Sequence, residues 1–158
     1  MMKKGFLFLL SLVLSHSALA ESDVDLALKA IGVIDEDYKY TDDDLAAAFF
    51  RLTTTQYAQS LPSDINSFTR IQSAMFTPYF ADVQAMYTIH FTEDERREVI
   101  NNFSSKQLLQ ELCIDYFIPN DFMLANNYTL IYSFHDQDYR RLADVQINSR
   151  TCLDALTN

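Results

Sequence analysis

The feature that most constrains the fold is a pair of cysteines, Cys113 and Cys152, the only two in the chain. The chain begins with an export signal, and outside the reducing cytosol two lone cysteines predict one disulfide. Cys113 lies near the end of an apolar helical pattern, and Cys152 follows the second of two alternating strands. Closing a loop of about 40 residues stabilises a fold by roughly 4 kcal/mol. We therefore expect a bond that clamps a helix onto a C-terminal hairpin.

Residues 1–20 have the pattern of an export signal. Residues 1–4 are basic, residues 5–14 are apolar, and Ala18-Leu19-Ala20 is the small-x-small pattern that precedes a cleavage point before Glu21. The apolar stretch is too short to span a bilayer as a helix. The short Met-Lys-Lys start is typical of bacteria. We expect a signal peptide over 1–20 and a mature domain without a membrane span, located in the periplasm or secreted further.

Residues 21–158 have a length that suits a single domain with its own core. Without the signal, the chain has 10 basic and 22 acidic residues. Such a surface repels phosphates and anionic lipid headgroups, which disfavours nucleic acid and membrane partners. It permits a basic protein partner.

Two helices are predicted at the start of the mature chain, over about 22–31 and 41–60. Ser22 can cap the first helix, and Gly32 occupies the position of a left-handed C-terminal cap. Thr41 begins a sequence that resembles a capping box for the second helix. This second helix has an apolar stripe, formed by Leu45, Ala48, Phe49 and Leu52.

Further capping boxes predict helices that begin at Thr92 and at Ser104. The second of these helices has one apolar face that places Cys113 toward the core, shared by Leu109, Leu112, Cys113 and Tyr116.

Four stretches alternate between apolar and polar residues as strands do, over 68–75, 82–91, 128–134 and 139–148. Short turn sequences join the first two and the last two, which predicts two hairpins. The expected fold is α+β, with a four-stranded antiparallel sheet made of two hairpins, helices packed on one face, and one disulfide.

The chain also resembles a group of small exported bacterial proteins. The resemblance rests on Leu61-Pro62, Thr69-Arg70-Ile71, Cys113, the Tyr-x-aromatic-x-Asp run from Tyr132 to Asp136, and Cys152. It spans about the last hundred residues. It implies a periplasmic location, the disulfide and the α+β architecture, and it adds nothing on activity.

Motifs for catalysis, nucleotide binding and metal binding are mostly absent from the sequence. Gly32 is the only glycine after residue 20, which excludes a Gly-rich phosphate loop, a dinucleotide fingerprint and a G-x-S-x-G nucleophile. His90 and His135 lack a partner at metal-ligand spacing, and the acidic clusters lack the spacing of a calcium loop. We assign no catalytic residue, no cofactor and no metal ligand. A pair of distant carboxylates for glycan hydrolysis is left open.

The aromatic content stands out, with 9 Tyr and 12 Phe. Most of these side chains are expected in the core and in cross-strand pairs. The candidates for a partner-binding patch are Phe76, Tyr79 and Phe80 around Pro78, because aromatic residues in a turn are hard to bury together.

The leading hypothesis is a non-enzymatic periplasmic domain that binds another protein, as an inhibitor, an immunity factor or an accessory of a secretion or envelope system. Two alternatives are a small glycan or cell-wall hydrolase that uses two carboxylates, and a small-ligand carrier. A groove with two acids at glycosidase separation favours the hydrolase, whereas an exposed aromatic surface favours the binding domain.

Overall fold

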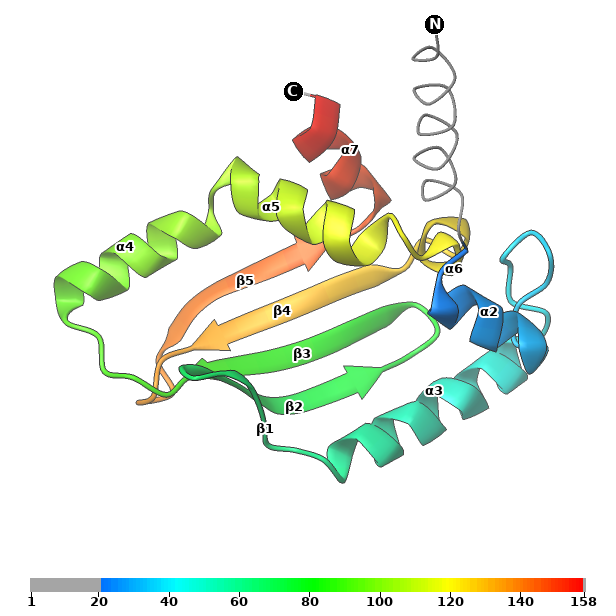
Figure 1. Cartoon of the computed structure of the whole chain (residues 1–158), viewed down its shortest axis with the longest axis horizontal. Coiled ribbons are helices and arrows are strands. Elements are labelled where there is room, and N and C mark those ends of the chain that lie inside the picture. The colour runs from blue at the N-terminus through cyan, green and yellow to red at the C-terminus, as the bar shows by residue number, and fades with distance from the viewer. Residues whose placement is uncertain (1–20, 158) are drawn as a thin grey trace, which may run out of the picture.

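A computed structural model describes residues 21–157 as a five-stranded sheet with helices packed against it (Figure 1). The signal peptide predicted over residues 1–20 lies outside the described residues. The strands lie in the sheet in chain order. They are β1 (Ser63–Asn66), β2 (Thr69–Phe76), β3 (Phe80–Tyr87), β4 (Thr129–His135) and β5 (Arg141–Ile147).

The α+β class and both predicted hairpins are confirmed, but the prediction of four antiparallel strands is wrong. β2 pairs with β3, and β4 pairs with β5, in antiparallel fashion. β3 and β4 are parallel, because the chain crosses back through helices before β4 begins. The extra strand, β1, pairs with the start of β2. The sheet is therefore mixed.

Seven helical segments accompany the sheet in the described residues. They are α2 (Asp23–Ala30), α3 (Asp43–Ala58), α4 (Glu93–Phe103), α5 (Lys106–Leu112), η1 (Cys113–Phe117), α6 (Asp121–Ala125) and α7 (Ser149–Thr157). The predicted caps at Ser22 and Thr92 are confirmed, and Gly32 has a φ of 74°. The cap of α3 is Asp42 and that of α5 is Ser105, each one residue later than predicted. α7 has no counterpart in the prediction.

One hydrophobic cluster joins most of the helices to a single face of the sheet. β3 and β4 contribute Ala81 and Leu130, and β5 contributes Val145 and Ile147. The helices contribute Leu28, Ala46, Phe50, Cys113, Phe117, Phe122 and Cys152. We call this face the inner face. On the opposite face the strands present polar side chains such as Gln84 and Gln146.

The buried side of α3 differs from its predicted stripe. Ala46 and Phe50 are buried, whereas Leu45 and Leu52 are exposed. The face in contact with the sheet is turned by about one residue from the stripe. Sequence periodicity alone does not resolve this difference when apolar residues lie side by side on a helix.

Candidate partner-binding site

Seven aromatic side chains lie on and beside the inner face of the sheet, and we call them the aromatic row. None of the seven is fully buried. They come from α3, β2, β3, α4, η1 and β4, and they are Tyr57, Phe76, Tyr87, Phe103, Tyr116, Tyr132 and Phe134.

The rings of the row contact one another from strand to helix. On β4, the ring centroids of Tyr132 and Phe134 lie 6.3 Å apart. The ring of Phe134 stacks on Phe103 of α4 at 4.2 Å, and Phe103 lies 6.5 Å from Tyr87 of β3. The small side chain of Ala85 lies beside Phe134 in the parallel register of β3 and β4. Tyr87, Phe103, Tyr132 and Phe134 therefore form one connected group of rings over the two central strands.

α3 forms one flank of the row. It lies beside β2 (Figure 1). Oγ1 of Thr54 accepts a hydrogen bond from the Phe76 backbone N–H at 2.8 Å and donates one to the Phe76 carbonyl at 3.1 Å. Three residues along α3, Tyr57 meets the ring of Phe76 edge-on at 5.5 Å. The helix thus occupies part of the β2 edge that β1 leaves unpaired.

The second flank is formed by α4, α5 and η1, and a disulfide fixes it. Cys113 and Cys152 are bonded, with their Cα atoms 5.6 Å apart, and both are buried. The predicted disulfide is confirmed. Because Cys152 lies in α7, the bond joins two helices that pack against β5.

The π-helical turn η1 corrects the predicted face of this helix. Phe117 is fully buried, whereas Tyr116 is 53% exposed. The spacing had placed Tyr116 in the core beside Cys113. A π turn has a wider hydrogen-bond ring than an α-helix, which shifts the residues that follow relative to the core. This shift brings Tyr116 to the surface.

A charge network anchors α4 to the turn between β4 and β5. The Asp136 carboxylate is buried and accepts hydrogen bonds from Nε and the backbone N–H of Arg140 at 2.8 and 2.9 Å. Arg96 of α4 lies 3.5 Å from the same carboxylate, and Glu93 pairs with Arg140 at 3.0 Å. Burial acts to raise the pKa of Asp136, but the hydrogen bonds from Arg140 outweigh it, and the pKa lies below its usual value.

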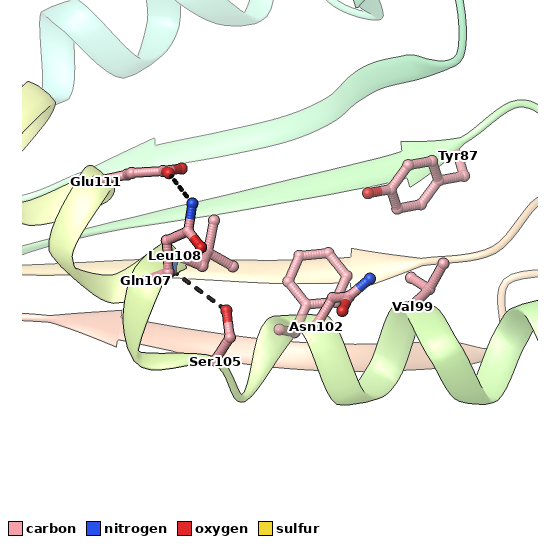
Figure 2. A pocket seen from close by; sticks show the side chains of 8 residues that line it. Tyr87, Val99, Asn102, Ser105, Gln107, Leu108 and Glu111 are labelled. Atoms are coloured by element: carbon pink, nitrogen blue, oxygen red, sulfur yellow. Dashed lines mark hydrogen bonds between the residues drawn. The ribbon is translucent and has the colours of Figure 1, made fainter.

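At the corner between α4 and α5 lies a hollow of about 350 Å³, which we call the corner hollow. Figure 2 shows its lining, with Glu111 at one end, Tyr87 at the other, and Leu108 between them. The complete lining is Tyr87, Val99, Asn102, Phe103, Ser105, Gln107, Leu108 and Glu111. It holds one carboxylate, that of Glu111.

Burial keeps the hydroxyls of two tyrosines of the row, Tyr87 and Tyr132, protonated near neutral pH. Burial raises the pKa of Tyr87. Burial, followed by the nearby Tyr116 and Tyr57, raises the pKa of Tyr132. The hydroxyls therefore stay available as hydrogen-bond donors to a partner.

The three aromatic residues singled out in the sequence do not share one surface. Phe76 belongs to the row, on the inner face. Tyr79 is exposed in the turn, and the alternation along β3 places Phe80 on the opposite face from Ala81. Their role in partner binding stays a prediction. The other six members of the row were not singled out, because they come from separate elements that only the tertiary fold brings together.

Within residues 21–157, no three His, Cys, Asp or Glu side chains are grouped so that they could hold a metal ion. None of the described helices combines the length and apolar character needed to cross a bilayer.

No protein-family model matches the chain, and no curated protein matches it. Among solved structures it is similar to a Pseudomonas aeruginosa protein described as secreted, with a TM-score of 0.51 and 14% identity over 70% of this chain and 95% of the other. This likeness shows a shared fold.

Two pilotins of type 2 secretion systems are also similar. EpsS from Vibrio vulnificus has a TM-score of 0.47 and 9% identity, and AspS from Vibrio cholerae has a TM-score of 0.41 and 12% identity. Each alignment covers 70% of this chain and 94% of the pilotin. These scores are too low to establish a common fold.

Proposed function

We propose that the chain is a non-enzymatic exported domain that binds an apolar segment of another protein through the aromatic row. It would serve as an inhibitor, an immunity factor or an accessory of a secretion or envelope system. The observation that carries the proposal is the row itself, in which Tyr57 of α3 and Tyr116 of η1 are exposed on the two flanks and the β4 side chains Tyr132 and Phe134 are partly buried.

Two properties of the row support binding. Aromatic side chains supply large contact areas at a low entropic cost, and tyrosine is enriched among the residues that dominate interface energetics. Both flanks are also fixed to the sheet, so little ordering has to accompany binding.

Export to the periplasm is part of the same proposal. A buried disulfide forms and persists in oxidising compartments. The apolar segment over residues 1–20 has the composition of a signal peptide.

The corner hollow bears on the two alternatives. A glycan hydrolase of the usual kind needs two carboxylates around one bond, and the lining supplies only Glu111. A volume of about 350 Å³ lies at the lower end of the range for small-molecule sites, so a ligand carrier is the second candidate.

The test uses cross-linking in periplasm, followed by affinity measurements with the purified partner. We expect Tyr116→Ala and Tyr57→Ala each to weaken binding by about tenfold or more, as truncation of an energetically dominant interface tyrosine does. Tyr139→Ala is the matched control, because Tyr139 is 72% exposed in the turn after β4 and is not part of the row. Equal affinities for all three variants would refute the aromatic row as the binding surface.

A further inference from the structure

The corner hollow has a charge that the aromatic row lacks. Glu111 is the one charged side chain in its lining. Its carboxylate accepts a hydrogen bond from Nε2 of Gln107 at 2.9 Å. Among the described residues it forms no ion pair. The negative charge of Glu111 thus has the neutral side chain of Gln107 as its hydrogen-bond partner and lies at one end of the hollow.

The remaining lining combines the polar side chains of Asn102, Ser105 and Gln107 with apolar side chains that can pack against an aliphatic stem. Leu108 and Val99 are apolar, and Phe103 adds an aromatic ring to the lining. In Figure 2, Glu111 and Tyr87 lie at opposite ends of the group, so a side chain held at Glu111 would extend over Leu108 toward the row. Lysine and arginine combine such a stem with a cationic head.

We infer that the corner hollow binds a lysine or arginine side chain of the protein partner, with the cation on Glu111 and the stem over Leu108 and Phe103. This inference rests on the proposed function, since it assigns a charge to the segment that the row binds. A cation would form a charge-assisted hydrogen bond with the free positions of the carboxylate. The acidic net charge of the domain would further attract a basic segment and repel an acidic one.

The experiment uses three eight-carbon probes, octylammonium, octanol and octanoate. Each is titrated into the folded protein while NMR follows the ring signals of Tyr87 and Phe103. Octanol reports on the apolar surface alone. We expect octylammonium to bind roughly two- to fivefold more tightly than octanol, which is the range for a solvent-exposed ion pair, and octanoate to bind more weakly than octanol.

The Glu111→Gln variant should remove the preference for octylammonium and leave the affinity for octanol unchanged. Because Glu111 is exposed, the variant should fold as the wild type does. Glu98→Gln is the matched control, since it removes an exposed acid of α4 outside the hollow and should keep the preference.

The outcomes separate the inference from the function on which it rests. If octanol and octylammonium bind equally well, or if Glu98→Gln and Glu111→Gln reduce the preference equally, the cation site is refuted and the aromatic row stands. If none of the probes affects the row, the proposed function fails, and the inference fails with it.

Discussion

The two flanks of the aromatic row are held in different ways. α3 is joined to β2 by the paired hydrogen bonds of Thr54 and by the contact between Tyr57 and Phe76. The opposite flank has a covalent bond to α7 and a buried charge network to the β4–β5 turn. Both flanks are anchored, but the flank of α4, α5 and η1 is held by a covalent bond and buried charges, whereas the α3 flank is held by weaker local contacts. Loss of a contact should therefore lower the free energy of unfolding more on the flank formed by α4, α5 and η1 than on the α3 flank.

The largest expected effect is at Phe117, which anchors η1 in the core. Phe117→Ala should lower the free energy of unfolding by about 3–5 kcal/mol, because it leaves a cavity in a packed interior. Tyr116→Ala, one residue earlier, should change it by less than about 0.5 kcal/mol. Urea denaturation of both variants tests this contrast. A large loss of stability in Tyr116→Ala would instead support the helix face predicted from the sequence, in which Tyr116 lies in the core beside Cys113.

Replacing Cys113 and Cys152 by serine should cost roughly 2–5 kcal/mol, because the bond restricts a long loop in the unfolded chain. Folded protein should still bind its partner, since both cysteines are buried in the core and are not accessible to a partner. Thermal denaturation and partner affinity measure the two effects. A double variant with normal stability and no binding would assign the cysteines to the functional surface, and two free thiols in periplasmic protein would refute the bond.

A pH-dependent effect is expected at Asp136. Its folded-state pKa is lowered, so its contribution to stability is fully present above the unfolded value of about 3.9 and is lost as the pH falls through the lower folded value. Asp136→Asn should cost about 1.5–3 kcal/mol at pH 7. The difference from wild type should vanish in acid, as measured by urea denaturation across pH. Asp94→Asn, which removes an exposed acid of α4, serves as the control and should show almost no effect.

The smallest effect is expected on the α3 flank. Thr54→Val keeps the shape of the side chain but removes both hydrogen bonds to Phe76, and should cost about 1 kcal/mol. Thr55→Val is the control, because the hydroxyl of Thr55 bonds only within its own helix. If Thr54→Val destabilised the protein as much as loss of the disulfide does, the two flanks would be equally anchored.

The sequence predicted the parts of the fold that depend on neighbouring residues. The caps at Ser22 and Thr92 and the two hairpins follow from local patterns, and the structure has them. β1 was missed because four residues without alternation do not indicate a strand. The parallel pairing of β3 with β4 was missed because pairing between strands that are distant in the chain leaves no pattern in the local sequence.

The buried position of Asp25 could not be predicted from the sequence, for a different reason. An aspartate in the first turn of a helix is ordinarily a solvated residue, and nothing in the sequence distinguishes this one. In the structure Asp25 is fully buried and accepts hydrogen bonds from the backbone N–H groups of Asp121 and Phe122 at 2.8 and 3.1 Å. Its partners lie so far along the chain that only the folded protein reveals them. The candidate site was missed for the same reason, apart from Phe76.

The parallel pairing of β3 with β4 also affects how the molecule is assembled. Phe80 meets Thr129 only after the whole helical crossover has formed, whereas the β2–β3 hairpin can close locally. Contacts between distant residues slow folding, because a long loop must be closed before they are made. Until then, β3 presents an open edge that another chain could pair with. A newly made chain would pass through this aggregation-prone stage before the second half of the sheet arrives to cover it.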